Sequence, residues 1–530
     1  MIAEFDTRCG EGYAPGGEVL PGDVGCGRAG APEKPSAAGS FAASRERFDG
    51  TLVWLGGGEA SGLAHGELEA RLQVDARELY RLLLQDHLDL RAEREVRIGR
   101  VAGADGVRRG CAEAGHRRSL LSVFGEVGVS RIAYRARGHE NLCPADAALN
   151  LPVEAHSHGL RRVSAIEAAR GSYDDTVAAL QRATGQRLGK RQVEALAQRA
   201  AVDFDGFYAA RKTASDRGDA LVISCDGKGV VMRHDALRPA TRRQAADATT
   251  KLKTRLSKGE KRNRKRLAEV GAVYEITPVA RTAADVMPAD DAQRAAAITA
   301  PVAKNKWLTA SVVDDAASVV AEIFAEADRR DPEHARDWVA LVDGNNHQIS
   351  RITTEATARG VTVTIVVDFI HVIEYVWKAA WSFHKEGDPA AELWVRQHAQ
   401  QILAGNATKV AGQIRRQATT ANLDTPQRAG ADACATYLTN KAPYLDYPTA
   451  LANGWPIATG VIEGACRHLV KDRMDITGAR WGLDGAEAIL KLRAIICNGD
   501  FDEYWTHHLT QERRRVHDSR YADNAPPSTS

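Results

Sequence analysis

The stretch Ala220-Leu-Val-Ile-Ser-Cys-Asp226-Gly-Lys-Gly is an apolar run that ends at a carboxylate. The stretch Trp338-Val-Ala-Leu-Val-Asp343-Gly-Asn-Asn has the same form. Short apolar runs bounded by glycine are typical of buried β-strands. Sites of open α/β sheets lie outside the carboxyl ends of the strands, where a buried strand holds the side chain rigidly. The two runs therefore predict an α/β fold with Asp226 and Asp343 at a candidate site, although either Asp could instead cap an ordinary turn.

The pattern around these runs is rich in strands. Strands are expected at residues 221–225, 270–276, 307–313, 339–342 and 361–367. A helix over 316–330 precedes the fourth strand, and a long helical stretch from 372 to about 441 follows the fifth. Consecutive strands followed by alternating helices and strands resemble the ribonuclease H-like fold. We therefore expect a ribonuclease H-like catalytic core that is interrupted by an all-α insertion.

A third carboxylate follows the insertion. Glu463 lies in Pro456-Ile-Ala-Thr-Gly-Val-Ile-Glu-Gly-Ala-Cys-Arg-His-Leu-Val-Lys471, which has the form of a turn that enters a helix. Arg467 and Lys471 would share its face and could contact the phosphates that flank a bound metal. Two Asp and one Glu can hold two Mg²⁺ ions about 3.5–4 Å apart across a phosphodiester. A surface ion pair between Glu463 and Arg467 is the alternative.

A second Asp competes for the site. Asp368 and His371 directly follow the strand expected at 361–367, which is β-branched almost throughout. His371 could orient a metal ligand or contact DNA, or it could be a packing histidine. The second catalytic carboxylate is therefore Asp343 or Asp368, and we favour Asp343.

Helices at 174–185 and 190–200, with Gly185 in the link, have the spacing of a helix-turn-helix. Lys190 and Arg191 would begin the second helix, where bases or phosphates are reached; an ordinary helical hairpin with a solvated basic face is the alternative. A basic segment over 251–266 suits phosphate contacts, unless it is only a solvated loop. Its candidate contact residues are Lys261, Arg262, Arg264, Lys265 and Arg266.

Bulk properties limit the class of protein. The net charge of +2 is nearly neutral, so any attraction to nucleic acid depends on local basic segments. The eight cysteines contain no Cys-x-x-Cys pair, which is typical of reduced thiols inside the cell. No apolar run approaches the ~18 residues of a membrane span. We expect a cytoplasmic, nucleoid-associated protein without a membrane partner. A zinc site remains an open alternative, with the candidate ligands Cys111, His116, His139 and Cys143.

Composition and periodicity divide the chain into six parts. Residues 1–66 are rich in Gly, Ala and Pro, and we expect a disordered N-terminal extension. A mainly helical DNA-binding region with a small β element is expected over 67–218. The core is expected over 219–380 and 451–500, on either side of a helical insertion over 381–450. A C-terminal tail over 501–530 completes the chain.

The order of motifs resembles one family. Cys225-Asp-Gly-Lys-Gly, Val342-Asp-Gly-Asn, Val367-Asp-Phe-Ile-His-Val, Thr459-Gly-Val-Ile-Glu-Gly-Ala and Arg480-Trp follow one another as in bacterial insertion-sequence DDE transposases of the ISKra type, which are related to the Mutator-like group. The resemblance covers about residues 120–500. The family often has Gly-Ser-Gly before its Glu, whereas this chain has Ala-Thr-Gly, which keeps a hydroxyl group.

The resemblance implies a catalytic triad of Asp226, Asp343 and Glu463 that binds two Mg²⁺ ions, with Mn²⁺ as a substitute. Asp368 and His371 would form the accessory motif, and Trp481 would stack on a displaced base unless it is a core residue. The implied reaction is cleavage at the ends of an insertion sequence and transfer of the 3′-hydroxyl into target DNA. Double-stranded DNA and a homodimer or higher oligomer are the implied partners. A structure-specific nuclease and a non-catalytic DNA-binding regulator are the alternatives.

Overall fold

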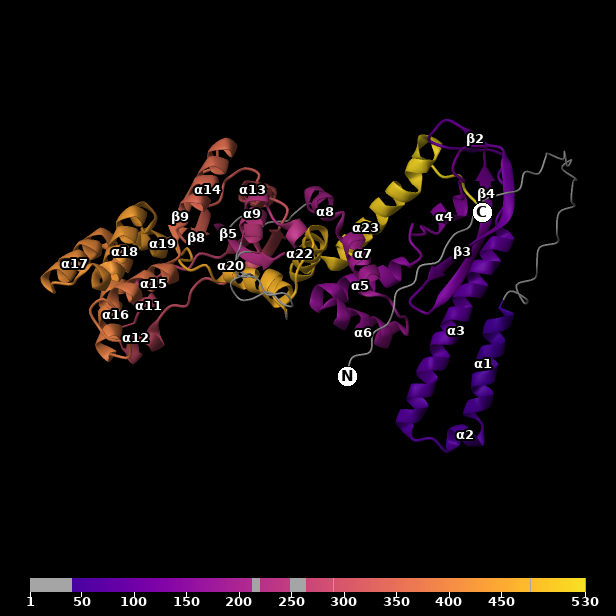
Figure 1. The fold of residues 1–530 in the computed structure, drawn as a ribbon, viewed down its shortest axis with the longest axis horizontal. Coiled ribbons are helices and arrows are strands. Elements are labelled where there is room, and N and C mark those ends of the chain that lie inside the picture. Colours follow the sequence, from indigo (N-terminus) through magenta and orange to yellow (C-terminus); the bar gives the residue numbers. More distant parts are fainter. Residues whose placement is uncertain (1–40, 212–219, 248–263, 289, 477, 530) are drawn as a thin grey trace, which may run out of the picture.

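The computed structural model describes residues 41–211, 220–247, 264–288, 290–476 and 478–529. The chain is elongated, with a central sheet that lies between a mixed N-terminal region and a cluster of helices (Figure 1). Among the described residues, no helix is long and apolar enough to cross a membrane.

Five strands form the central sheet: β5 (Ala220–Val231), β6 (Lys265–Ile276), β7 (Lys304–Ser311), β8 (Trp338–Val342) and β9 (Val363–Val367). Their order is β7-β6-β5-β8-β9. The pairs β7·β6 and β6·β5 are antiparallel, and the pairs β5·β8 and β8·β9 are parallel. All five residues of β8 are buried, as expected for an apolar run in the middle of a sheet. The α/β class and all five expected strands are confirmed.

Helices make the parallel crossovers and carry the chain beyond the sheet. Helix α13 (Ala316–Arg330) connects β7 to β8, and α14 (Asn346–Arg359) connects β8 to β9. The connection between β6 and β7 contains two short helices, α11 (Ala283–Val286) and α12 (Asp291–Ala296). Between β5 and β6 lie the 3₁₀ turn η1 (His234–Ala236) and α9 (Pro239–Asp247).

Helices fill the stretch between β9 and Glu463, where the sequence predicts an all-α insertion. Its helices are α15 (Phe369–Ala380), α16 (Pro389–Leu403), α17 (Ala407–Thr420), α18 (Thr425–Lys441), η2 (Ala442–Tyr444) and α19 (Tyr447–Ala452). It begins earlier than expected, because α15 starts directly after β9 and packs on α16 and α18. The chain then returns to the sheet through α20 (Gly460–Ala465), the π-helical η3 (Cys466–Lys471), α21 (Asp472–Met474) and α22 (Leu483–Cys497).

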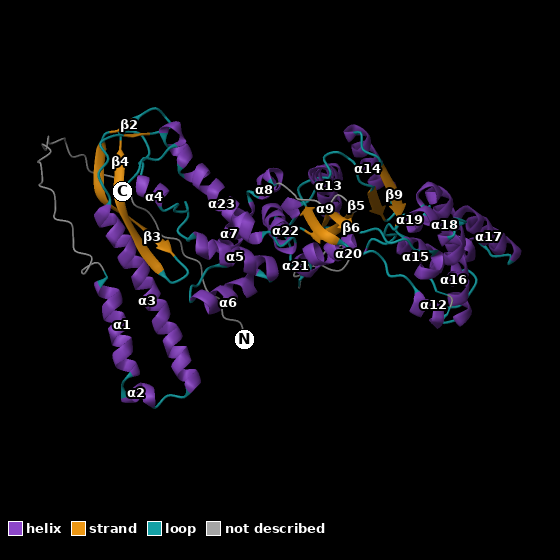
Figure 2. Ribbon diagram, turned by 180° about the vertical axis from the view of Figure 1, so that it is seen from behind, coloured by secondary structure: helices purple, strands orange, loops and turns teal. Residues whose placement is uncertain are grey.

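The N-terminal region combines helices with a β-hairpin (Figure 2). Its helices are α1 (Ala42–Leu55), α2 (Gly58–Ser61), α3 (His65–Arg94), α4 (Pro144–Ala148), α5 (His158–Arg170), α6 (Tyr173–Thr184), α7 (Lys190–Ala201) and α8 (Phe204–Ala210). Its strands are β1 (Val101–Ala102), β2 (Arg108–Arg109), β3 (Cys111–Leu121) and β4 (Glu126–Arg135). The helix pair α6–α7 is confirmed, and Gly185 ends α6 with φ 74°, a conformation that favours glycine.

The expected disorder over residues 1–66 is wrong for the part that the structure describes. Helices α1 and α2 occupy most of residues 42–61, and α1 packs against α3. Polar contacts hold this pair, since Arg47 lies 2.6 Å from Asp75 and the guanidinium of Arg71 lies over the ring of Trp54. Helix α1 buries no apolar side chain, so apolar periodicity could not reveal it. Residues 1–40 lie outside the described residues.

The expected C-terminal tail is also wrong, because it contains a long helix that packs on the N-terminal region. Helix α23 (Phe501–Val516) is followed by η4 (Asp518–Arg520) and η5 (Ala522–Asn524). The backbone N–H of Ala104 donates to the carbonyl of Arg520 at 2.9 Å, and Tyr521 forms a β-bridge with Gly103. The last residues therefore complete the region with which the described chain begins.

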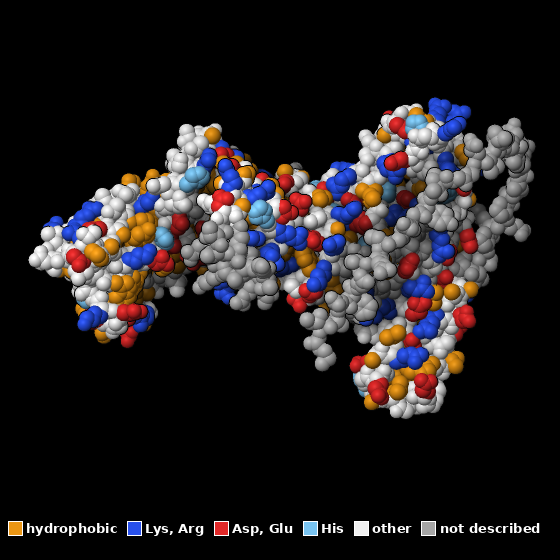
Figure 3. Space-filling view, in the orientation of Figure 1, with side chains coloured by type: hydrophobic (Ala, Val, Ile, Leu, Met, Phe, Trp, Pro, Cys, Tyr) orange, Lys and Arg blue, Asp and Glu red, His pale blue; other side chains and the backbone are white. Residues whose placement is uncertain are grey.

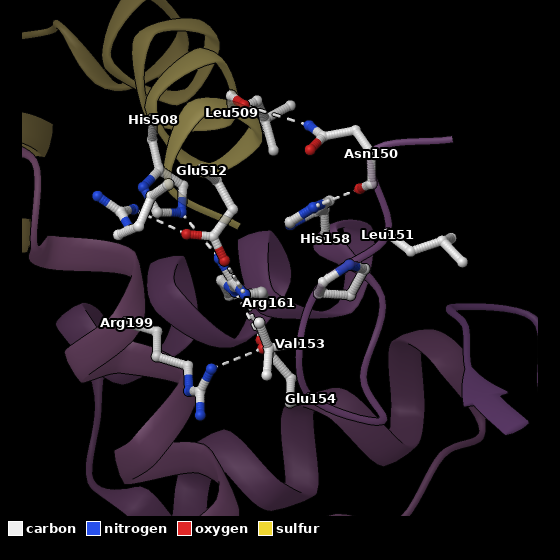
Figure 4. Close-up of polar contacts among 12 residues, drawn as sticks. Asn150, Leu151, Val153, Glu154, His158, Arg161, Arg199, His508, Leu509 and Glu512 are labelled. Atoms are coloured by element: carbon white, nitrogen blue, oxygen red, sulfur yellow. Dashed lines mark hydrogen bonds and ion pairs between the residues drawn. The ribbon is translucent and has the colours of Figure 1, made fainter. Parts of the chain in front are cut away.

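A buried ionic network fastens α23 (Figure 4). The guanidinium of Arg161 on α5 is fully buried between Glu154 and Glu512, and Glu512 lies at 2.9 Å. His508 bridges Arg161 at 3.0 Å to Asp203 at 2.7 Å. Burial alone would raise the pKa of Asp203, but hydrogen bonds from His508 and from Arg515 hold it at about 2. Because a buried charge is stable only when it is paired, these residues hold α5, α8 and α23 together.

We predict that Glu512→Gln lowers the free energy of unfolding by about 2 kcal/mol, because Arg161 and Arg515 each lose an ionic acceptor. The measurement is thermal or denaturant unfolding of the full chain. Glu503→Gln, an exposed carboxylate on the same helix, is the control and should change stability by less than about 0.5 kcal/mol.

The pH dependence of stability follows from Asp203, in the same ionic network. The folded pKa of Asp203, about 2, lies below its ordinary value of 3.8, so its contribution to stability is complete above pH 4. That contribution is lost as the pH falls from 4 towards 2.

Equal stability of Glu512→Gln and wild type would contradict a structural role for the network.

Candidate active site at the carboxyl ends of the parallel strands

Strand register brings three Asp residues onto one line. Leu221 pairs with Trp338, and Trp338 pairs with Val363. Continuing both ladders past the ends of the strands places Asp226, Asp343 and Asp368 side by side on β5, β8 and β9. The backbone N–H of Asp368 donates to the carbonyl of Val342 at 2.8 Å, so the β8–β9 ladder does continue that far. Adjacent strands lie about 4.8 Å apart, which makes these backbones close neighbours.

The helix that carries Glu463 is bonded to both ends of this line. The thiol of Cys466 donates to Oδ2 of Asp226 at 3.3 Å. The hydroxyl of Thr459 lies 2.6 Å from Oδ2 of Asp368 and 3.4 Å from Oε1 of Glu463. Helix α20 and the π-helical turn after it also pack against β5 and β6. The structure therefore brings all four sequence-predicted carboxylates to one edge of the sheet.

The carboxylates differ in exposure. Asp368 is 2% exposed, and it also caps α15 by accepting the N–H of Ile370 at 2.8 Å. Asp226 and Asp343 are half-buried, and Glu463 is exposed. A buried carboxylate that already accepts two hydrogen bonds is suited to hold its neighbours in place. This difference supports Asp343 over Asp368 as the second carboxylate that faces a ligand.

The negative charge of the site contributes to raised pKa values of two nearby thiols. Burial raises the pKa of Cys225 to about 12, and the charges of Glu269, Asp226 and Asp343 add to the effect. Burial also raises the pKa of Cys466, with Asp226 as the largest charge contribution and a smaller one from Glu463. A raised pKa disfavours the thiolate, which is the form in which a cysteine acts as a nucleophile.

The helical insertion supports the loop after β8. Gly344 has φ 89°, and a Cβ there would lie 2.4 Å from the hydroxyl of Tyr437 on α18. That hydroxyl donates to the carbonyl of Asp343 at 3.0 Å, and the Tyr437 ring stacks on Tyr375 at 4.0 Å between centroids. Lys441 donates to the side chain of Asn346 in the same loop. The insertion is therefore a structural part of the candidate site.

Several predicted DNA contacts are exposed. On α7, Lys190 pairs with Asp174 at 2.7 Å, and Arg191 is exposed. Near Glu463, Lys471 is exposed, and Arg467 is 71% exposed and lies 3.7 Å from Asp472. These side chains are accessible at the surface, as a DNA contact requires.

The basic segment is divided. Lys265 is exposed and Arg264 is half-buried, whereas Lys261 and Arg262 lie outside the described residues. The guanidinium of Arg266 donates to the carbonyls of Val312, at 2.5 Å, and Ala236. Burial lowers the pKa of Arg266, with the nearby charge of Arg238 acting in the same direction. Arg266 is therefore already used in holding β6 to its neighbours.

Two further residues were predicted to act at the site: Trp481 in base stacking, and His371 in orienting a metal ligand or contacting DNA. Trp481 is 4% exposed, and its indole N–H donates to the carbonyl of Met474 at 3.0 Å, so it is a core residue and its ring is not accessible to a base. Burial of its large apolar ring decides between the two alternatives. His371 lies 3.7 Å from Glu374 and contacts the ring of Tyr437, 5.9 Å between centroids.

The zinc alternative receives no support. His139 lies 3.0 Å from Asp105, and His116 lies 3.1 Å from Glu113, so each histidine has a separate carboxylate partner. Within the described ranges, no group of three or more His, Cys, Asp or Glu is arranged to hold a metal ion. Neither the β-hairpin nor the four carboxylates form such a group among the described residues.

Sequence reasoning missed Cys466, Tyr437 and Lys441. Cys466 follows Glu463 by three residues, so helical spacing could have placed it beside the carboxylate. No local signal marks Tyr437 or Lys441, because only the packing of α18 against α15 brings them to the loop after β8.

Comparison of the chain with models of known protein families and with curated proteins finds no match.

We predict that Thr459→Val lowers the free energy of unfolding by about 1–3 kcal/mol, because it leaves the buried carboxylate of Asp368 without its closest donor. Thr459→Ser keeps the hydroxyl and should restore most of this loss. Chemical denaturation of the three proteins provides the measurement, and an equal loss in Thr459→Ser, which keeps the hydroxyl, would contradict the assignment of the effect to the hydrogen bond with Asp368.

We predict that Tyr437→Phe speeds amide hydrogen exchange in the loop over residues 343–346 by about fivefold, because it removes a hydrogen bond worth about 1 kcal/mol. Tyr375→Phe is the matched control, since it keeps the ring stack and its hydroxyl has no hydrogen bond among the described contacts. Unchanged exchange in Tyr437→Phe would show that the loop is held by other contacts.

Proposed function

We propose that this protein is a DNA transposase of the DDE type, which cuts the ends of an insertion sequence and transfers the 3′-hydroxyl into target DNA. One observation carries the proposal. Asp226 lies within β5, Asp343 and Asp368 directly follow β8 and β9, and the register of the two parallel ladders aligns the three residues. Hydrogen bonds join the helix of Glu463 to the two outer Asp residues. The order of motifs along the chain, which resembles ISKra-type transposases, supplies the reaction class.

The sheet supports a ribonuclease H-like core as part of this proposal. Three antiparallel neighbours, β7, β6 and β5, are followed by two parallel strands, each reached through a helix. That sequence of connections is the one expected from the apolar runs of the chain. The helices lie between the fifth strand and the Glu463 helix, as the helical pattern of the sequence predicts.

The donor set suits a divalent cation in its chemistry. Asp226, Asp343 and Glu463 offer only carboxylate oxygens, the ligand class that Mg²⁺ and Mn²⁺ prefer. Lys441 donates a hydrogen bond to Asn346, near the loop of Asp343. The three groups would hold up to two ions. Their side chains would first have to move, because they form no three-ligand group among the described residues. Such ions, when bound, acidify the attacking water and stabilise the leaving 3′ oxygen.

The other residues have positioning roles in this proposal. Asp368 and Thr459 orient Glu463, Cys466 orients Asp226, and Tyr437 holds the loop of Asp343. The nucleophile is water in the first step and the freed 3′-hydroxyl in the second. No covalent enzyme intermediate is required, in agreement with the raised pKa of both nearby thiols.

DNA recognition is assigned to two exposed places. The beginning of α7, with Lys190 and Arg191, would contact the transposon end in the manner of a helix-turn-helix. Arg467 and Lys471 lie on the turns after Glu463, where phosphates that flank the cleavage position would pass. A protein with this activity would be found with the nucleoid.

We predict that the purified chain nicks DNA that carries the ends of its own element in the presence of Mg²⁺ or Mn²⁺. Asp226→Asn, Asp343→Asn and Glu463→Gln each remove a ligand charge at nearly constant shape and should reduce the rate by at least about 100-fold. Glu392→Gln, an exposed carboxylate on α16, is the control with unchanged activity. Denaturing gels of end-labelled DNA provide the measurement.

The outcomes separate the candidate functions. Nicking at the 3′ boundary of the element by wild type alone supports the transposase. Nicking of branched DNA regardless of sequence indicates a structure-specific nuclease. Specific end binding without nicking by any variant indicates a non-catalytic regulator, and equal nicking by Glu463→Gln removes Glu463 from the site.

A further inference from the structure

Helices α1 and α3 form a two-helix arm that projects from the rest of the chain (Figure 1). Ser44 is the buried residue of α1, and the pair is held by polar contacts such as Arg47–Asp75 at 2.6 Å. The backbone N–H of Ser44 donates to Asp86 at 3.1 Å. An isolated pair of helices with so little buried apolar surface is marginal in water, because most helical stability comes from packing an apolar face.

The outer face of α1 exposes large apolar side chains. Phe48 is 49% exposed, Leu52 is 51% exposed and Val53 is 77% exposed. Phe48 and Leu52 are four residues apart and therefore lie on one face of the helix. The space-filling view shows hydrophobic side chains at the surface of the arm, between charged ones (Figure 3). Apolar side chains in this arrangement favour an associating surface.

The same face carries two charges of opposite sign. Arg45 and Asp49 are also four residues apart, and both are exposed. Neither side chain has an ion pair among the described residues, although the spacing would allow one within the helix. An exposed cation and an exposed anion on either side of one helical position form a self-complementary pattern.

We propose that α1 is a dimerisation surface, and that it pairs antiparallel with α1 of a second copy of this chain. A twofold axis level with Arg47 places Arg45 opposite Asp49 of the second copy, and Asp49 opposite Arg45 of the second copy. The apolar side chain of Leu52 then lies over Ala42 of the second copy, with Phe48 close to the axis. The contact is isologous and joins two helical arms into a four-helix bundle.

The chemistry of the face favours a second copy over other occupants. Nucleic acid requires a predominantly basic surface, whereas the exposed residues of α1 include one arginine, two acidic side chains (Glu46 and Asp49) and apolar side chains. The first 40 residues of the chain contain no sustained apolar period that would match it. A second α1 supplies both the matching apolar face and the opposite charges in the required order.

The test is a charge exchange in the full-length chain, measured by sedimentation equilibrium without DNA or divalent metal. Wild type should be a dimer at micromolar concentration. Arg45→Asp and Asp49→Arg each place like charges opposite each other twice in the dimer, and each should weaken association by about tenfold or more. The double variant restores opposite charges and should recover dimerisation. Glu392→Arg, an exposed reversal on α16, is the control.

Two results would overturn the proposal. One is a monomeric wild type under these conditions. The other is a dimer in which both single variants associate like wild type, or in which the double variant is no better than the singles while its circular dichroism is unchanged. Because the assay contains neither DNA nor metal, its outcome is independent of whether the carboxylate site cuts DNA.

Discussion

Parallel pairing in a fixed register is the constraint on which the candidate site depends. Strand β8 is bonded on both sides, to β5 and to β9, so it cannot shift without breaking two ladders. The side-chain period of a strand is two, and a shift by one residue would turn each Asp to the opposite face. The polar residues that follow the apolar runs are therefore neighbours as a result of the pairing, without needing contacts of their own.

The sequence predicted this part of the protein well because apolar runs and strand ends are local signals. The five strands, the all-α insertion, the α6–α7 pair and the position of Asp226, Asp343 and Asp368 at one edge could all be inferred from order and periodicity. Tyr437 and Lys441 could not, because their role depends on how α18 packs against a loop nearly 100 residues earlier in the chain. For Trp481 the sequence left base stacking and a core position open, and its burial assigns it to the core.

The regions that were missed have polar contacts in place of an apolar core. Helix α1 is held by Arg47, Arg71 and Ser44, and α23 is held by the network around Arg161. Such contacts have no periodicity, and each pairs residues far apart in the sequence. Ionic pairing makes the stability of these regions respond to pH, because the charges of the paired groups change on titration.

The position of Glu512 late in the sequence affects when the N-terminal region can be completed during synthesis on the ribosome. Arg161 and Glu512 are separated by 351 residues, so a ribosome finishes the sheet and the insertion before it makes the second acidic partner of Arg161. At a usual rate of about 5–20 residues per second, this interval lasts roughly 20–70 seconds. Throughout that time α5 lacks the helix that covers it, and the N-terminal region is incomplete. All four carboxylates of the candidate site are therefore synthesised before the helix that completes the ionic network of the N-terminal region.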